Sequence, residues 1–141
     1  MKSATTIKSA TSTRAGTFKQ SVRVRDHQMT ADEPTDEGGT DAGPSPLELL
    51  AASLASCTAV TMEMYASRKG WDIGDVEVEA QFTPPDRGCP TSFALTLRFP
   101  DHLTDEQIQR LEVIAAKCPV HRTLEGEVMF DERVERIQLA R

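Results

Sequence analysis

Apolar residues are most concentrated in the middle of the chain, where residues 47–62 carry a single charged side chain. Ser45 suits a helix N-cap and Pro46 the first helical position, and Arg68-Lys69-Gly70 combines cations with a left-handed stop. The pattern predicts a helix over residues 45–69. Because this helix is apolar all round, other elements have to cover most of its surface.

Alternation of apolar and polar residues predicts strands on both sides of this helix. Residues 1–30 alternate in part and suit two or three short strands. Their basic, Ser- and Thr-rich first part also resembles a transit peptide in composition, but it lacks the amphipathic helical pattern of one, and we favour strands. Residues 74–99 predict two strands joined by a turn rich in Pro and Gly, and residues 127–134 predict a final strand.

Two further segments complete the expected order of elements. Residues 31–44 are rich in acid, Gly and Pro and predict a loop, long enough for a lid or a binding wall. Thr104 suits the cap of a second helix over residues 104–118, with an apolar stripe on one face. The expected order of elements indicates one α+β domain over residues 1–141. That order is strands, a buried helix, strands, an amphipathic helix and a strand. The cover that the central helix needs favours a homodimer.

Composition narrows the classes of partner. The formal net charge of −6 disfavours a nucleic-acid ligand, because phosphate binding requires a basic surface. No run approaches the roughly 18 consecutive apolar residues of a spanning helix, so we expect no membrane segment. Three cysteines with no secretory signal argue against a disulfide framework and for reduced thiols in a cytoplasmic protein.

Two of the cysteines fall on apolar helix faces. Cys57 shares its face with Leu54 and Thr61, and Cys118, at the end of the second helix, follows the apolar stripe of that helix. Two packed helices could therefore bring the thiols together. The alternative is that both thiols are inert packing, because free Cys is among the most buried residue types. Cys89 falls in the turn rich in Pro and Gly, and we interpret it as exposed and incidental.

Other chemistries have weaker support. Cys118 and His121 offer two kinds of metal ligand, but they lack the paired spacing of a zinc knuckle, so we predict no metal. There is no Gly-x-Ser-x-Gly elbow and no phosphate loop. A hydrolase built on Cys57 with a His and an Asp stays open by residue count alone, although no local signature supports it.

Several segments together carry a family resemblance. They are Asp32-Glu33-Pro34, Gly38-Gly39-Thr40-Asp41, Gly43-Pro44-Ser45-Pro46-Leu47-Glu48-Leu49-Leu50, Cys57-Thr58-Ala59, Met64-Tyr65-Ala66, Arg68-Lys69-Gly70-Trp71 and Cys118-Pro119-Val120-His121-Arg122-Thr123-Leu124. In this order and separation they resemble the OsmC-like branch of the OsmC/Ohr family, named for osmotically induced protein C and organic hydroperoxide resistance. The resemblance covers most of residues 25–130.

The resemblance implies an intertwined homodimer in which antiparallel sheets wrap two central helices, with a site at the dimer interface. It implies an antioxidant peroxidase that acts in the response to oxidative stress. Cys57 takes the peroxidatic role, and Cys118 resolves its sulfenic acid as an intramolecular disulfide. An external dithiol reduces that disulfide, an organic hydroperoxide is the substrate, and no metal or organic cofactor is required.

Two positions depart from the family pattern. The characterised peroxidases carry an activating carboxylate ten residues before the helix cysteine, where this chain has Leu47. Glu48 lies one place later, on the opposite helical face, and suits a capping-box acid. The activating arginine of the family maps best to Arg14, although Arg23 or Arg25 could serve. The alternative function is therefore a non-catalytic member of the fold that binds a small molecule or senses redox state.

Overall fold

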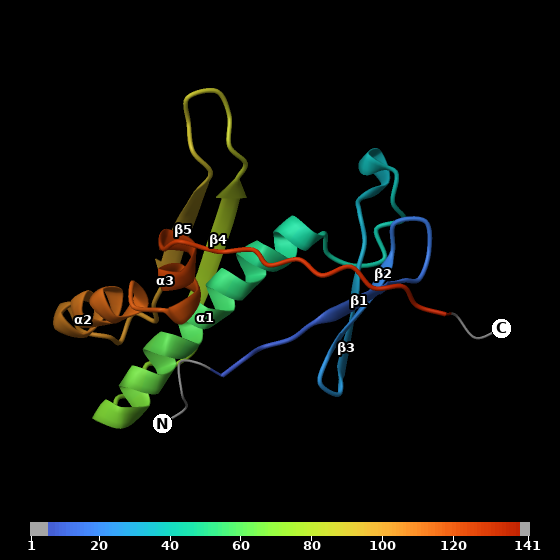
Figure 1. Ribbon diagram of the computed structural model, residues 1–141. Coiled ribbons are helices and arrows are strands. Elements are labelled where there is room, and N and C mark those ends of the chain that lie inside the picture. Colours follow the sequence, from blue (N-terminus) through green and yellow to red (C-terminus); the bar gives the residue numbers. More distant parts are fainter. Residues whose placement is uncertain (1–5, 139–141) are drawn as a thin grey trace. The chain divides into compact units, whose positions relative to one another are not determined.

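The computed structural model describes residues 6–138 and has an α+β fold of small antiparallel sheets and helices (Figure 1). Contacts divide the described chain into two compact units. Within the described residues, 6–56 and 78–98 form the first unit, and 57–77 and 99–138 form the second. The units interleave along the sequence, and the central helix contributes residues to both.

The first unit contains a three-stranded antiparallel sheet in the order β1-β2-β3. Its strands are β1 (Thr11–Arg14), β2 (Gln20–Val24) and β3 (His27–Ala31). Val24 pairs with His27 across a two-residue turn, in which Arg25 takes a positive φ of 54°. The region that resembles a transit peptide in composition thus contains strands from residue 11 onward.

The loop after β3 is held by a buried carboxylate. Asp32 is only 1% exposed, and its side chain accepts hydrogen bonds from the Thr40 hydroxyl at 2.6 Å and from the Ala42 N–H at 3.1 Å. The loop includes a short 3₁₀ turn, η1 (Thr35–Glu37). It also has no room for a side chain at Gly39, where a Cβ would lie 1.9 Å from the Glu33 carbonyl oxygen. Hydrogen bonds to Asp32 and close backbone packing at Gly39 therefore hold this segment in a defined conformation.

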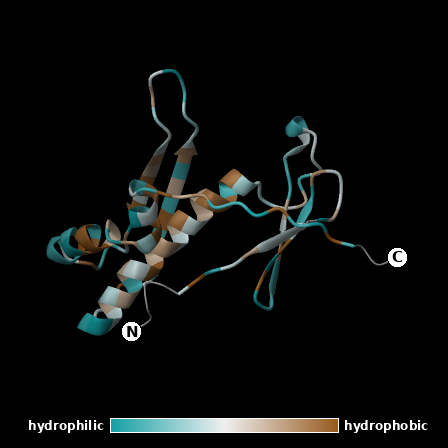
Figure 2. Cartoon of the chain, in the orientation of Figure 1, coloured by the Kyte–Doolittle hydropathy of each residue, from teal (hydrophilic) through white to brown (hydrophobic). Residues whose placement is uncertain are grey.

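The central helix α1 (Pro46–Lys69) begins with a capping box. The Glu48 carboxylate accepts from the Ser45 N–H at 2.8 Å, and the Ser45 hydroxyl accepts from the Glu48 N–H at 3.2 Å. Apolar and small residues predominate along α1, and its C-terminal end is hydrophilic (Figure 2). By length and composition α1 could cross a membrane, a test that core helices of soluble proteins also pass. Buried residues recur along α1 at every fourth position, from Leu54 to Ala66, which is the pattern of a core helix.

A second antiparallel sheet pairs β4 (Glu77–Thr83) with β5 (Ser92–Arg98). These are the two strands predicted within residues 74–99. Phe82 and Phe93 lie on one face of the pair, with ring centroids 5.2 Å apart. The turn between the strands carries Cys89, which is exposed.

The second unit contains two helices after the sheet, α2 (Asp105–Ala115) and α3 (Pro119–Glu125). Thr104 and Gln107 form a capping box at the start of α2, and Leu111, Ile114 and Ala115 are its buried residues. The predicted helix over 104–118 therefore ends three residues early, and a separate short helix begins at Pro119. Proline at the first helical position starts a helix as readily as it ends the preceding one, which explains the difference.

The structure shows no strand at 127–134, where the sequence predicts a final one. Within residues 6–138 this segment has no regular secondary structure and pairs with no strand. Its apolar side chains stand in solvent, with Met129 92% and Phe130 89% exposed. Alternation in the sequence indicates that a segment can form a strand, but a strand also needs a neighbour for its backbone hydrogen bonds. The described chain does not supply one.

Candidate thiol site

The second unit brings two of the three cysteines together. Cys57 lies on α1, and Cys118 lies in the short link from α2 to α3, where it is the N-cap residue of α3. Their side chains are in hydrogen-bonding contact, and the two cysteines are not joined by a disulfide. Cys118 is completely buried, whereas Cys57 is half-buried.

The start of α3 directs backbone donors at this pair. The N–H groups of Val120 and His121 lie against the Cys118 sulfur, and the Val120 N–H also lies against Cys57. They do not form a regular side-chain cap, but first-turn N–H groups have no partner within the helix and favour a negative charge. Pro119 occupies the first helical position and has no N–H, so the next two residues provide the donors.

The two sulfurs differ in their acidity. Burial raises the pKa of Cys57, and its hydrogen bond to Cys118 acts in the same direction. For Cys118, burial also opposes the thiolate, but the hydrogen bonds from Cys57, His121, Thr58 and Val120 outweigh it and lower the pKa.

The expected supporting residues are engaged elsewhere. Arg14 lies on β1, and its Nε donates to the Gly16 carbonyl oxygen at 2.8 Å. Glu48 belongs to the capping box of α1, and the hydrogen bonds from Ser45 lower the pKa of its carboxyl. Both residues belong to the first unit, and both thiols belong to the second. Arg14 and Glu48 therefore stay predictions as supporting residues.

The residues that could hold a metal do not gather. Among the described residues, no group of three or more His, Cys, Asp or Glu side chains is placed to hold a metal ion. His121 instead pairs with Glu125 on α3, with Nε2 at 3.2 Å from the carboxylate, and its Nδ1 is buried without a partner. His102 contacts the Asp72 carbonyl oxygen at 2.9 Å.

Sequence reasoning missed three members of the site. Thr58 is completely buried and its side chain hydrogen-bonds the Cys118 sulfur. Val120 and His121 act through their backbone, so their side-chain types gave no signal. The signal that was present is Cys-Pro: a proline at the first position of a helix makes the preceding cysteine its N-cap.

The OsmC-like protein family matches residues 38–133, more than half of the chain. No curated protein sequence matches the chain. Solved structures similar to it include an OsmC-like protein from Mycoplasma pneumoniae, with 20% identity, a TM-score of 0.72 and coverage of 86% of this chain and 89% of that one.

Two other similar structures have names that refer to hydroperoxides. One is an organic hydroperoxide resistance protein OsmC from Legionella pneumophila, with 21% identity, a TM-score of 0.66 and coverage of 88% and 93% of the two chains. The other is the organic hydroperoxide resistance protein OhrB of Bacillus subtilis, with 23% identity, a TM-score of 0.60 and coverage of 87% and 93%. At these identities the structures establish the fold. With its α+β fold and the match over residues 38–133, the chain belongs to the OsmC-like family.

Proposed function

We propose that this protein is a thiol-dependent peroxidase that reduces organic hydroperoxides, with Cys57 as the peroxidatic residue and Cys118 as the resolving residue. The observation that carries the proposal is the contact between the two thiol side chains. Relatives of the same fold that are named organic hydroperoxide resistance proteins support the choice of substrate class.

The solvent exposure of each sulfur supports the peroxidatic role of Cys57 and the resolving role of Cys118. Cys57 is half-buried and can meet a substrate, whereas Cys118 is completely buried and meets only its neighbours. The Cys57 thiolate attacks the distal oxygen of ROOH, the O–O bond breaks, and the products are Cys57 sulfenic acid and an alkoxide that takes a proton. The Cys118 thiolate then attacks the Cys57 sulfur, forming the disulfide and releasing hydroxide. An external dithiol restores both thiols.

The proposal includes a homodimer in a reducing, cytoplasmic compartment. Free thiols fit such a compartment. Exposed apolar side chains in the segment after α3 fit an interface with a second copy. In the dimer, Arg14 or Glu48 of either copy is a candidate for supporting Cys57.

A second candidate is a redox sensor or binding protein that keeps the fold and turns over poorly. The specific observation in its favour is that the Glu48 carboxylate caps α1, and Leu47 stands where characterised peroxidases carry the activating carboxylate. Such a protein would still form the Cys57–Cys118 disulfide, but slowly and without sustained consumption of hydroperoxide.

Hydroperoxide consumption in the presence of a dithiol tests the proposal. Wild type, Cys57→Ser and Cys89→Ser are compared with an organic hydroperoxide and with hydrogen peroxide. We expect turnover in wild type and Cys89→Ser, a preference for the organic substrate, and loss of activity in Cys57→Ser. Cys89→Ser is the matched control because Cys89 is a free thiol on an exposed turn.

Mass spectrometry after one equivalent of oxidant tests the second thiol. We expect a Cys57–Cys118 disulfide in wild type and overoxidised Cys57 in Cys118→Ser. Disulfide formation without sustained turnover would favour the sensor. Absence of both the disulfide and turnover, with several hydroperoxides and dithiols, would reject redox chemistry at this pair.

A further inference from the structure

The imidazole ring of His121 contains a buried polar atom that has no partner. Its Nδ1 makes no hydrogen bond, and no other buried side-chain nitrogen or oxygen within residues 6–138 is left unpaired in this way. Buried polar groups in native proteins are almost always hydrogen-bonded, because burial removes their contact with water. An unpaired one therefore needs an explanation, and a role in chemistry is one such explanation.

The other ring nitrogen fixes the state of this atom. His121 Nε2 lies 3.2 Å from a carboxylate oxygen of Glu125, one turn further along α3. An ionised carboxylate only accepts hydrogen bonds, so in the neutral ring Nε2 carries the hydrogen and Nδ1 carries the lone pair. A histidine whose ring is held by a third group is the usual arrangement of a base in thiol and hydroxyl chemistry.

The residue that carries this lone pair lies against the resolving thiol. Cys118 is the N-cap of α3 and His121 is its third helical residue, the two positions that meet in a capping box. The His121 N–H contacts the Cys118 sulfur, so the imidazole is attached within a side chain's length of that sulfur. Cys118 attacks as a thiolate, and because it is completely buried its proton has to pass to a group inside the protein.

We propose that His121 is the proton shuttle of the resolving step: Nδ1 takes the proton of Cys118 and passes it to the group that leaves Cys57. This inference rests on the proposed peroxidase function. It gives His121 no part in the first step, in which Cys57 attacks the hydroperoxide. Glu125 is a positioning residue, because it holds the ring through Nε2 and leaves Nδ1 for the proton.

The protons and electrons of the resolving step balance within the site. Cys118–SH gives its proton to His121, and the Cys118 thiolate attacks the sulfur of Cys57–SOH. The S–S bond forms as the S–O bond breaks, and the departing hydroxide takes the proton from the His121 imidazolium and leaves as water. The sulfurs end as a disulfide, with the hydroperoxide of the preceding step as the oxidant, and His121 is neutral again.

Methyl methanethiosulfonate tests this step without a hydroperoxide. The Cys57 thiolate displaces methanesulfinate from the reagent and becomes a methyl disulfide. Cys118 then attacks the Cys57 sulfur, forms the internal disulfide and expels methanethiolate, which takes the proton and leaves as methanethiol. Intact-mass spectrometry of acid-quenched samples measures the rates of both steps. All variants carry Cys89→Ser, so that this exposed thiol does not react.

Two substitutions remove the titrating ring and keep an amide in its place. We expect His121→Gln and His121→Asn to keep the wild-type rate of the first step and to slow the second on the order of a hundredfold, a usual contribution of general acid–base catalysis. His102→Gln is the matched control, because the His102 ring contacts the Asp72 carbonyl oxygen, and both of its steps should match wild type.

The positioning role of Glu125 has its own pair of variants. Glu125→Ala removes the group that holds the ring and should slow the second step by a smaller factor than the His121 variants. Glu125→Gln still offers an oxygen to the Nε2 hydrogen and should stay closer to wild type. The Glu125 side chain is 66% exposed, so this pair decides the question if circular dichroism shows that neither His121 variant folds.

The outcomes separate this inference from the proposed function. A second step at the wild-type rate in folded His121 variants would overturn the shuttle, even if wild type reduces hydroperoxides. Slowing of both steps together would indicate a structural role for His121 and would overturn it as well. A slowed second step with a normal first step would support the shuttle even if wild type consumes no hydroperoxide, which would reject the peroxidase. A wild type that forms no internal disulfide with the reagent would overturn both.

Discussion

At the scale of single residues, Asp32 shows how one buried carboxylate holds a long loop. The hydrogen bond from the Thr40 hydroxyl is the largest influence and lowers the pKa of Asp32, against the effect of burial. Backbone N–H groups of Ala42, Glu33 and Thr40 add to the lowering. A carboxyl whose pKa is lower in the folded state stabilises the fold above its unfolded value of about 3.9, and it loses this contribution as pH falls through the folded value.

We therefore expect Asp32→Asn to melt several degrees below wild type at neutral pH. The gap should close as the pH falls below about 4, because wild type then loses the same interaction by protonation. Thermal unfolding followed by circular dichroism at a series of pH values measures the gap. Asp36→Asn, an exposed acid in the same loop, is the control and should melt like wild type throughout. A gap that persists unchanged in acid would contradict the charge-based account.

The sequence predicted only some of the residues that make up the site. The spacing of each cysteine from its apolar neighbours predicted that Cys57 and Cys118 lie on apolar helix faces. Whether those faces meet depends on how α1 packs beside the link from α2 to α3. The donors to Cys118 are backbone N–H groups, and these are the same for any side chain. Glu48 was correctly interpreted as a capping acid, because its spacing from Ser45 is a local signal.

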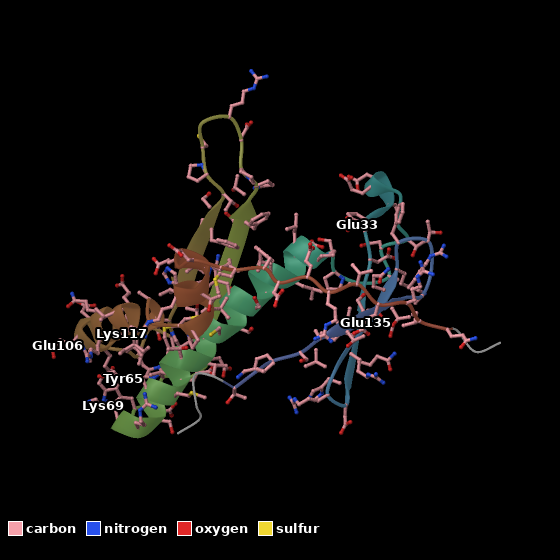
Figure 3. The ribbon with its side chains drawn as sticks, in the orientation of Figure 1. Glu33, Tyr65, Lys69, Glu106, Lys117 and Glu135 are labelled. Atoms are coloured by element: carbon pink, nitrogen blue, oxygen red, sulfur yellow. The ribbon has the colours of Figure 1, made fainter. Side chains whose placement is uncertain are left out.

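At the scale of elements, a polar cluster ties α2 to the end of α1. Arg110 of α2 donates from Nε to the Tyr65 hydroxyl of α1 at 2.9 Å. Lys69 lies one turn further along α1, on the same side as Tyr65 (Figure 3), with Nζ 5.7 Å from the ring centroid. Trp71 packs edge-on against the same ring, with centroids 5.6 Å apart. The hydrogen bond from Arg110 is the largest influence and lowers the pKa of Tyr65.

This cluster can be measured selectively because Tyr65 is the only tyrosine in the chain. We expect phenolate absorbance in a pH titration to appear below the ordinary tyrosine pKa of about 10. Arg110→Met should move the titration back toward that value, because it removes both the hydrogen bond and a nearby positive charge. Arg68→Met, which removes a neighbouring cation of α1, should leave it in place. Identical titrations for wild type and Arg110→Met would show that the hydrogen bond from Arg110 to Tyr65 is absent in solution.

The elements with local signals were predictable, and those that depend on distant partners were not. Both long helices carry capping residues that the sequence marks, and β4 and β5 alternate around a turn. The short helix α3 was not predicted from the sequence, because a proline such as Pro119 can follow the end of one helix as well as begin the next. The strand at 127–134 was predicted from alternation alone, and the described chain contains no strand that pairs with it.

At the scale of the whole molecule, the segment after α3 exposes hydrophobic side chains that an isolated chain does not cover. Val134 is 93% exposed and Ile137 is 80% exposed, in addition to Met129 and Phe130. An extended segment with free backbone groups and exposed apolar side chains is suited to pairing with a second chain. The dimer that the resemblance implies would supply that partner, and it would also give the alternating segment the strand conformation that its sequence predicts.

We therefore expect wild type to sediment with twice the mass of one chain, and the double variant Phe130→Asp, Val134→Asp to dissociate at micromolar concentration. Two buried carboxylates in the interface would lose hydration without a charged partner, which disfavours the dimer. Glu132→Lys, in the same segment, changes charge without adding polarity to an apolar position and should keep the dimer. Analytical ultracentrifugation over a concentration series measures all three.

Because the family resemblance places the site at the interface, hydroperoxide turnover per chain should fall in step with dissociation in the double variant. A wild type that is monomeric at tens of micromolar would reject the dimer, and a monomeric variant with full turnover would show that one chain completes the site.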